Sequence, residues 1–309
     1  MIDAHVHVLA KASREFPREV SDTLPAGREE SAEKLLGLME AHGVERATLV
    51  QIGGTSLETH AYLRNCLKRY PDRFKGIGLV PDPRRPEDHM DRLAEDGGIV
   101  GFRLHEIGGP LDPTAPMDVR TFSTYPFWKH AALKDYIVWL YPRAAEAHLT
   151  PWLLDAFPEL TVVFNHLMVC PPEGSMTTDE QGRPRMIRRT FTNDQPLTRH
   201  NTLGLAQFPN VCVKLSGQYA FSQEPYPYLD LRRWHGELVM EMGADRCMWA
   251  TDFPWIQEDP GYGKLTRVLD DLLPDLGEED RALIMDGTAR RMVWREPGSD
   301  DDEIGRPAS

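Results

Sequence analysis

Short apolar runs rich in β-branched residues alternate along this chain with longer segments whose apolar positions recur at helical spacing. A helix that follows each strand carries the chain back to the same edge, so this alternation predicts parallel strands. Eight runs have the character of buried strands: residues 2–8, 47–52, 76–80, 99–105, 136–141, 161–166, 211–216 and 247–252. Helices are expected between them, near residues 29–42, 55–70, 86–94, 126–134, 142–157, 196–207, 228–242, 262–273 and 278–286.

Eight strands in a chain of 309 residues predict a closed (β/α)8 barrel, the TIM barrel, over a doubly wound open sheet. The candidate catalytic side chains favour the closed form as well. They fall at the C-terminal ends of strands one, four, five, six and eight, which surround one mouth in a barrel. We expect one barrel domain over residues 1–295 and an acidic, disordered tail over 296–309.

Charge and cysteine content narrow the range of partners. The formal net charge is −13, which disfavours nucleic acid and anionic membranes as binding partners. The four cysteines form no Cys-x-x-Cys motif, and no apolar run reaches the length of a membrane span. We therefore expect a cytoplasmic protein that binds a small anionic organic substrate, either as a monomer or as a homo-oligomer.

The first strand carries the most informative polar pattern. At period two, Asp3, His5 and His7 face one way. Two imidazoles on one side of a strand can bind a divalent metal or flank a polarised substrate atom. Two solvent-facing histidines on an edge strand would give the same pattern, but a barrel brings Asp252 of the last strand beside them. The apolar residues of the strand are expected to form the opposite, outer row: Ile2, Ala4, Val6 and Val8.

Asp252 and His166 each end an apolar strand. Asp252 is a candidate general base that takes a proton from an attacking water; the alternative is a turn residue before Phe253-Pro254. His166 is a candidate for polarising a substrate carbonyl, protonating a leaving oxygen or completing a metal site. Its alternative is a core histidine whose hydrogen bonds are satisfied.

Strands four and five supply candidate substrate-binding residues. Arg103 emerges from an apolar run, where an unpaired guanidinium is costly. It therefore either pairs with a structural carboxylate or binds a substrate carboxylate through two hydrogen bonds. His105 and Tyr141 are further candidates for contacting the substrate, and Tyr141 fits a barrel-interior aromatic equally well.

Two later loops are candidate pocket walls. The insertion over residues 172–195 carries a basic cluster that either draws an anionic substrate to the mouth or is a solvated loop. The loop after strand seven is rich in aromatic residues. The members of the two groups are Arg183, Arg185, Arg188 and Arg189, and Tyr219, Phe221, Tyr226 and Tyr228. No Gly-x-Ser-x-Gly motif is present, which excludes the serine hydrolases that depend on it.

Four motifs together resemble the amidohydrolase superfamily, in its amidohydrolase-related branch. Within that branch the chain is most similar to TIM-barrel lactonases such as 2-pyrone-4,6-dicarboxylate lactonase. The resemblance implies a (β/α)8 fold and hydrolysis at carbonyl centres, with decarboxylation in some relatives. The motifs are Ile-Asp-Ala-His-Val-His at 2–7, Lys-Leu-Ser-Gly at 214–217, Trp-Ala-Thr-Asp-Phe-Pro-Trp at 249–255 and Gly-Thr-Ala-Arg-Arg-Met at 287–292.

The same resemblance leaves two hypotheses for a cofactor. Relatives with one ion usually hold it with the strand-one histidine pair, a strand-five histidine and the strand-eight aspartate. Tyr141 stands where that strand-five histidine is expected, as in the pyrone lactonase, which works without a metal; Arg103 matches its anion-binding arginine. Either the site needs no metal, or it holds one divalent ion, Zn or Mn. In the second case the ligands would be His5, His7, His166 and Asp252.

These observations predict an enzyme. The favoured function is hydrolysis of a lactone or related cyclic ester of a small organic acid. Asp252 would activate water, with assistance from His5, His7 and His166. The alternative is a hydrolase, or a non-oxidative decarboxylase of an aromatic or muconate-like acid, that depends on a single divalent metal. A barrel that only binds a small ligand is a third option, but such a barrel has no physical need for this constellation.

Overall fold

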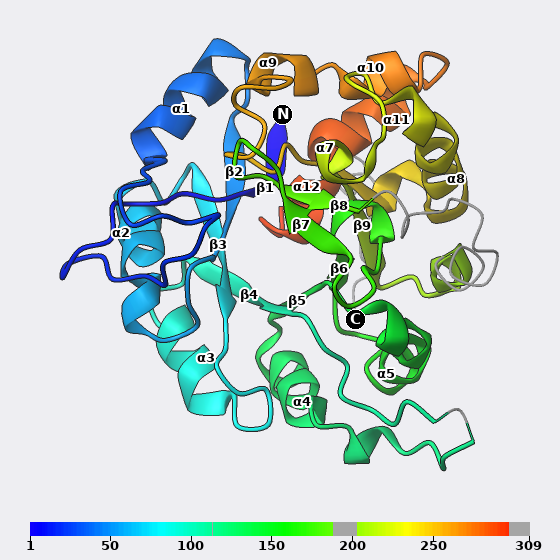
Figure 1. Ribbon diagram of the computed structural model, residues 1–309. Helices are drawn as coiled ribbons and strands as arrows, with labels where there is room; N and C mark the ends of the chain where they lie inside the picture. Colours follow the sequence, from blue (N-terminus) through cyan, green and yellow to red (C-terminus); the bar gives the residue numbers. More distant parts are fainter. Residues whose placement is uncertain (113, 188–202, 297–309) are drawn as a thin grey trace, which may run out of the picture.

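Parallel strands surround a central axis in a computed structural model that describes residues 1–112, 114–187 and 203–296 (Figure 1). Their order follows the chain, β1-β2-β3-β4-β5-β6-β9-β10, so the (β/α)8 prediction is confirmed. Two backbone hydrogen bonds close the ring between β10 and β1: His7 N donates to Phe253 O at 2.7 Å and Asp252 N donates to His5 O at 3.0 Å. The strands are β1 Ile2–Val6, β2 Arg46–Val50, β3 Phe74–Leu79, β4 Ile99–Leu104, β5 Ile137–Leu140, β6 Val162–Phe164, β9 Val211–Leu215 and β10 Cys247–Trp249.

Helices form an outer layer around the strands (Figure 1). Most lie where the sequence predicts them, although several expected helices are divided into shorter pieces. The predicted helix over 142–157, for example, is a 3-10 segment, Ala144–Leu149, followed by α5. The helices are α1 Ala32–Ala41, α2 Ala61–Arg69, α3 Glu87–Ala94, α4 Tyr125–Lys134, α5 Thr150–Ala156, α7 Gln218–Phe221, α8 Arg232–Met242, α9 Tyr262–Leu265, α10 Val268–Leu272, α11 Glu278–Ala282 and α12 Thr288–Met292.

Two apolar clusters alternate along the strands, as period two requires. On β5, Val138 and Leu140 pack outward with the helices, while Ile137 and Trp139 belong to a smaller cluster inside the barrel. Ala289 and Val293, in and just after α12, join this inner cluster, so α12 closes one end of the barrel.

The strict alternation predicted for the first strand is wrong. Ile2 and Ala4 belong to the inner cluster, whereas Val6 belongs to the outer one. The register between β1 and β2 shifts between Asp3 and Val6. Such an irregularity lets consecutive residues turn toward the same side and re-aims the side chains beyond it.

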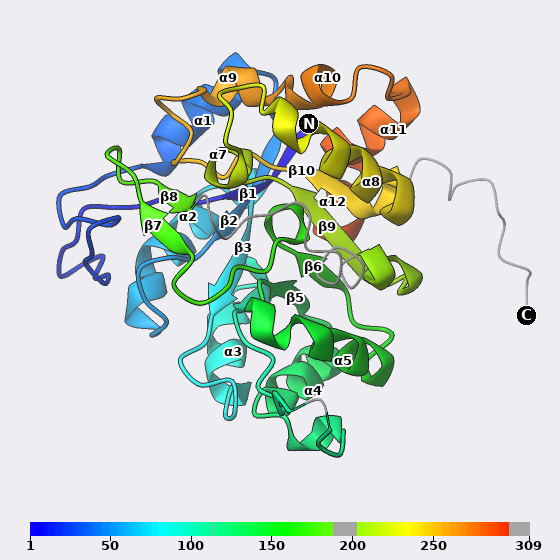
Figure 2. The ribbon, with the colours of Figure 1, turned by 45° about the vertical axis from the view of Figure 1, so that its right-hand side comes forward.

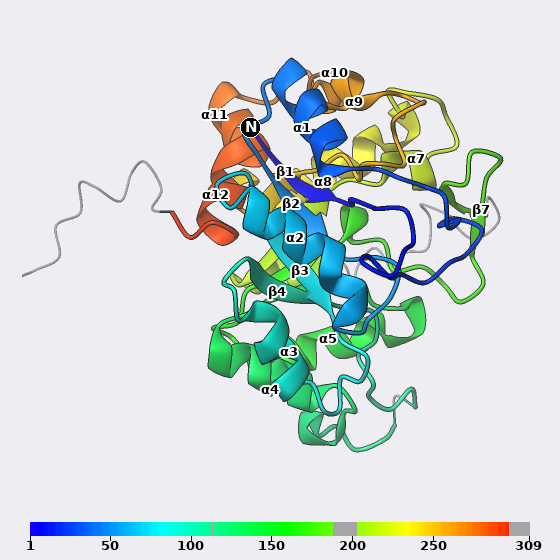
Figure 3. The same ribbon diagram turned by 90° about the vertical axis from the view of Figure 1, so that its left-hand side faces the viewer.

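The C-terminal ends of the strands lie at the end of the barrel opposite α11 and α12 (Figure 3). At this mouth the structure differs from the loop predicted over 172–195. Strands β7, Met176–Thr178, and β8, Pro184–Met186, form an antiparallel hairpin that lies next to α7 (Figure 2). Residues 188–195 of that insertion, residues 196–202 of the helix predicted over 196–207 and most of the predicted acidic tail fall outside the described residues. In the part of the chain that is described, no helix is long and apolar enough to cross a membrane.

Candidate active site

The ends of β1 and β10 bring His5, His7 and Asp252 together. Oδ1 of Asp252 lies 3.6 Å from Nε2 of His5 and 3.5 Å from Nε2 of His7. The two imidazole Nε2 atoms are 3.2 Å apart. All three side chains are almost fully buried. The two backbone hydrogen bonds that close the barrel therefore also bring the motifs at 2–7 and 249–255 together in one site.

Asp252 is held in the left-handed backbone region, with φ of +62°. Aspartate is among the few non-glycine residues that adopt this conformation routinely. Its other carboxylate oxygen, Oδ2, accepts a hydrogen bond of 2.8 Å from the hydroxyl of Tyr219 on α7. Oδ1 has no hydrogen-bond partner in the described structure, so it remains available to a water or a substrate proton.

His166 reaches the same centre from the end of β6. Its ring centroid lies 4.9 Å from that of His5 and 5.3 Å from that of Tyr141. The backbone turns sharply here, with positive φ at three consecutive residues from His166 onward, and such strained segments cluster at functional sites. Ser216 Oγ is 2.9 Å from His166 Nδ1 and fixes the direction of the ring.

Gly217 makes room for that histidine. Its φ is +74°, and a Cβ placed there would lie 3.0 Å from Nδ1 of His166. Only glycine satisfies both the backbone angle and the close approach without strain. The Lys-Leu-Ser-Gly motif thus supports the site through Ser216 and Gly217.

Arg103 and Tyr141 lie on the far side of the same mouth. The guanidinium carbon of Arg103 is 5.3 Å from the centre of the Tyr141 ring. Arg103 is 9% exposed, and its Nε has no hydrogen-bond partner among the described residues. It forms no ion pair with any carboxylate of the described residues. His105 lies further out, exposed, with its ring 6.0 Å from Tyr141.

Burial and charge set the protonation of the centre. Burial alone would raise the pKa of Asp252, but nearby His166 and the Tyr219 hydrogen bond hold it well below its usual range. Burial lowers the pKa of His166 to about 3, and burial together with Lys214 lowers the pKa of His5 strongly. Near neutral pH the centre therefore holds the ionised carboxylate of Asp252 beside the imidazoles of His5 and His166, which do not readily take up a proton.

Three buried residues at the centre were not assigned a role from the sequence. The sequence pattern places Tyr219 only in an aromatic loop and Lys214 only in a motif, and it gives Trp139 no role. Lys214 and Trp139 both contact Nδ1 of His5, and Lys214 Nζ lies 4.4 Å above the Trp139 ring. A lysine inside an apolar strand run is a signal that sequence analysis could have used.

The hairpin packs against α7, the helix that carries Tyr219. Arg185 donates to the backbone oxygen of Tyr219, and Arg183 forms an ion pair of 2.8 Å with Asp179. Arg183 is thus bound to a structural carboxylate, and Arg185 anchors the helix that positions Tyr219. The other two members of the predicted basic cluster, Arg188 and Arg189, lie outside the described residues.

The spacing of the polar atoms would suit one metal ion, but the donor set does not. His5, His166 and Asp252 offer ligand atoms within 4.8 Å of one another. A histidine that binds a metal normally donates its other ring N–H to an oxygen. His7 and His166 meet this requirement through Val50 O and Ser216 Oγ, whereas His5 faces the nitrogens of Trp139 and Lys214.

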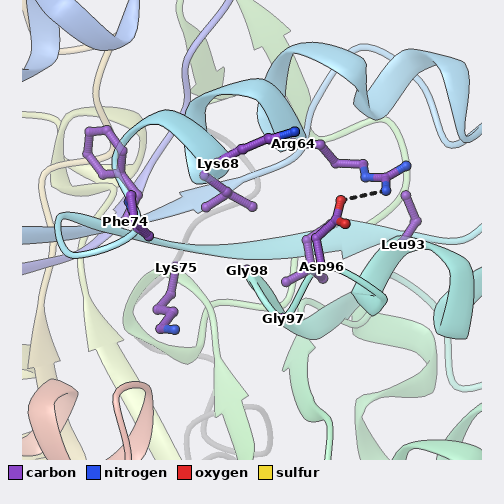
Figure 4. Close-up of a pocket in the computed structure, with 11 residues that line it drawn as sticks. Arg64, Lys68, Phe74, Lys75, Leu93, Asp96, Gly97 and Gly98 are labelled. Atoms are coloured by element: carbon purple, nitrogen blue, oxygen red, sulfur yellow. Dashed lines mark hydrogen bonds and ion pairs between the residues drawn. The ribbon is translucent and has the colours of Figure 1, made fainter.

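A separate cavity of about 380 Å³ lies at the opposite, N-terminal end of β3 and β4 (Figure 4). Asp96 on its wall is already paired with Arg64 at 2.7 Å, and Lys68 and Lys75 also line the cavity. None of the predicted site residues lines it. In TIM barrels, chemistry takes place at the C-terminal end of the strands, so we assign the site to the mouth with Asp252.

Comparisons with known proteins agree with the fold. A family model described as Amidohydrolase matches residues 2–294. Gamma-resorcylate decarboxylase from Rhizobium sp. (strain MTP-10005) is 24% identical over 298 residues, 83% of this chain and 85% of that protein. A probable 2-pyrone-4,6-dicarboxylic acid hydrolase from Acinetobacter baumannii, solved with citric acid bound, has a TM-score of 0.70 at 18% identity and covers 95% of this chain and 98% of its own. A Burkholderia multivorans amidohydrolase with bound zinc has a TM-score of 0.67 at 19% identity, over 96% and 99% of the two chains.

Proposed function

This chain belongs to the amidohydrolase family whose model spans residues 2–294, a family of enzymes that includes hydrolases and decarboxylases, and from this premise we propose that it hydrolyses a lactone or related cyclic ester of a small organic acid. Asp252 is the general base of the proposal, and Arg103 binds a carboxylate of the substrate. Water is the nucleophile.

The observation that carries the proposal is the unpaired guanidinium of Arg103. It lies almost fully buried at the mouth without an ion pair to any described carboxylate, although burial of a lone charge is costly. A substrate carboxylate would supply the missing partner through two charge-assisted hydrogen bonds. The names of the similar proteins point to the same ligand chemistry: a pyrone dicarboxylic acid, citric acid and a resorcylic acid.

The proposed reaction adds water across the ring C–O bond. Oδ1 of Asp252 removes a proton as the water oxygen bonds to the carbonyl carbon. His166 and His5 are the N–H donors placed to stabilise the oxyanion that develops on the carbonyl oxygen. When the ring C–O bond breaks, the protonated Asp252 returns its proton to the leaving oxygen. The product is the ring-opened hydroxy acid or its keto tautomer, and Asp252 is ionised again.

The proposal includes no metal ion, because the environment of His5 is that of a hydrogen-bonding residue. Tyr141 provides no imidazole from strand five, and a phenol is a poor ligand near neutral pH. Burial raises the pKa of the Tyr141 hydroxyl further. The hypothesis with one bound divalent ion, Zn or Mn, remains the competing account, and it is favoured by the zinc-bound relative.

A second candidate function is non-oxidative decarboxylation of an aromatic acid. It is favoured by the similarity to a gamma-resorcylate decarboxylase. Arg103 would then hold the carboxylate that departs as CO2 rather than one that orients the ring. The two candidates differ in their products: lactone hydrolysis forms a new carboxylic acid, whereas decarboxylation releases CO2.

The test is to assay the purified protein with 2-pyrone-4,6-dicarboxylate and simpler carboxylated lactones, following acid release, and with 2,6-dihydroxybenzoate, following CO2. Lactone turnover that falls by ~10²–10⁴ in an Asp252→Asn variant with an unchanged circular dichroism spectrum supports the proposal. CO2 release from the aromatic acid, with no acid release from any lactone, would replace it with the decarboxylase function.

A further inference from the structure

His5 of β1 and His7, which directly follows the strand, differ in what surrounds their Nδ1 atoms. Nδ1 of His7 lies 2.7 Å from the backbone oxygen of Val50. A carbonyl oxygen can only accept, so Nδ1 of His7 carries a proton. In the neutral ring, the lone pair of His7 is then on Nε2, which points toward His5 and Asp252.

His5 has the opposite arrangement. The indole N–H of Trp139, which can only donate, lies 3.2 Å from Nδ1 of His5. The amine of Lys214 contacts the same atom. Nδ1 of His5 must therefore present its lone pair, and the proton of the neutral ring resides on Nε2.

These two tautomers complement each other. Nε2 of His5 is 3.2 Å from Nε2 of His7, a donor facing an acceptor. A one-way chain of hydrogen bonds results: Trp139 donates to His5, His5 to His7, and His7 to the Val50 carbonyl. Each member of this chain is buried, so water does not compete for these groups.

We infer that Trp139, with Lys214 beside it, is a positioning residue that fixes His5 as an Nε2–H donor and so makes the β1 histidine pair a hydrogen-bonding couple rather than a pair of metal ligands. A metal at Nε2 of His5 would require the ring to move its proton to Nδ1, where the Trp139 N–H would then have no acceptor. It would also break the His5–His7 hydrogen bond. A substrate carbonyl oxygen at this position would instead accept a hydrogen bond from the Nε2–H group of His5.

This inference deepens the proposed function, since it assigns a cause to the absence of a metal from that reaction. It concerns the ring proton of His5, which can be observed without any substrate. Its failure can therefore be distinguished from a failure of the lactonase assignment.

The first experiment is nitrogen NMR of the whole protein labelled with ¹⁵N-histidine, with His5→Gln and His7→Gln variants to assign the two rings. We expect proton-bearing Nε2 and bare Nδ1 for His5, and the reverse for His7. A His5 ring with its proton on Nδ1 would overturn the inference.

The second experiment measures zinc binding by calorimetry and elemental analysis in Trp139→Phe, with Trp128→Phe as the matched control. Trp128 is equally buried, and its indole nitrogen has no partner in the described structure. We expect Trp139→Phe to bind zinc at least tenfold more tightly than wild type, because its His5 is free to move the proton, while Trp128→Phe behaves as wild type. Unchanged zinc binding in Trp139→Phe, or submicromolar zinc binding by the wild-type protein, would refute the inference.

Discussion

The hydroxyl of Tyr219 donates a hydrogen bond of 2.8 Å to Oδ2 of Asp252. This contact joins α7, which the sequence did not predict, to the residue at the centre of the site. It leaves Oδ1 as the carboxylate oxygen that faces the two histidines. The hairpin β7–β8 holds α7 in turn, through the contact between Arg185 and the backbone oxygen of Tyr219.

Replacing Tyr219 by phenylalanine should lower kcat about tenfold with little change in KM. A hydrogen bond to a charged group contributes about 1.5–3 kcal/mol, and part of this orients the carboxylate. Steady-state kinetics on the identified substrate measures the effect. Tyr228→Phe is the matched control, because that buried hydroxyl has no hydrogen-bond partner in the described structure. Equal losses in both variants would mean that the Tyr219 hydroxyl has no special role.

Replacing Arg103 by methionine should lower kcat/KM for a carboxylated lactone by about 30–150-fold, the equivalent of about 2–3 kcal/mol for a charge-assisted pair. A neutral lactone of the same ring size should lose far less. The comparison of the two substrates separates carboxylate binding from general damage to the barrel. A similar loss on both substrates would contradict the assignment of Arg103.

Replacing Gly217 by alanine should lower both stability and activity. The new Cβ is strained at φ of +74° and lies 3.0 Å from Nδ1 of His166. We expect the melting temperature to fall by about 1.5–3 °C, since about 1–2 kcal/mol is lost in a domain of this size. Gly174→Ala is the control: its φ is +72°, but nothing lies within 4 Å of a Cβ there. If Gly174→Ala impairs activity as much, the contact with His166 is not the cause.

The free energy of unfolding should fall as pH drops from 8 to 5. His60 is buried, donates from Nδ1 to Ser56 O and accepts at Nε2 from Leu79 N. Burial lowers its pKa to about 4, below the value of about 6.5 in the unfolded chain. The unfolded state therefore binds more protons between these values, and stability is lost through that window. At pH 5 the loss from His60 is about 2 kcal/mol.

Urea unfolding of wild type and His60→Gln at both pH values measures this linkage. The variant is less stable throughout because its hydrogen bonds change, but its loss between pH 8 and pH 5 should be smaller. His235, whose pKa is also lowered to about 4 by burial, should keep part of the pH dependence in both proteins. Equal losses on acidification in wild type and variant would exclude His60 as a contributor.

The barrel and part of its mouth could be predicted because they follow from local rules. Period-two alternation marks the strands, and helical spacing marks what lies between them. A closed ring then brings the ends of the first and last strands together, so the proximity of His5, His7 and Asp252 followed from chain order alone. The roles of these residues remain predictions, as does the acidic tail beyond residue 295.

The partners of these residues could not be predicted because they depend on contacts across the barrel. The alternation expected along β1 failed at a shift of register that no local pattern indicates. Trp139 and Lys214 lie on strands far apart from β1 in the sequence. They contact His5 because all three side chains point into the barrel at the same level along its axis. The position of Tyr219 depends on the β7–β8 hairpin, and the sequence pattern predicted only a polar loop in its place.

The most direct test of metal-independent lactone hydrolysis is an assay of stripped protein. The protein is treated with chelator until elemental analysis finds less than about a tenth of an equivalent of zinc and manganese, and it is then assayed on the carboxylated lactone that it turns over. We predict that kcat stays within about twofold of the untreated value. His5 and His7 are hydrogen-bonded to each other, and Asp252 needs no metal ion to accept a proton. Activity that disappears on stripping and returns only when a divalent ion is added would contradict the account.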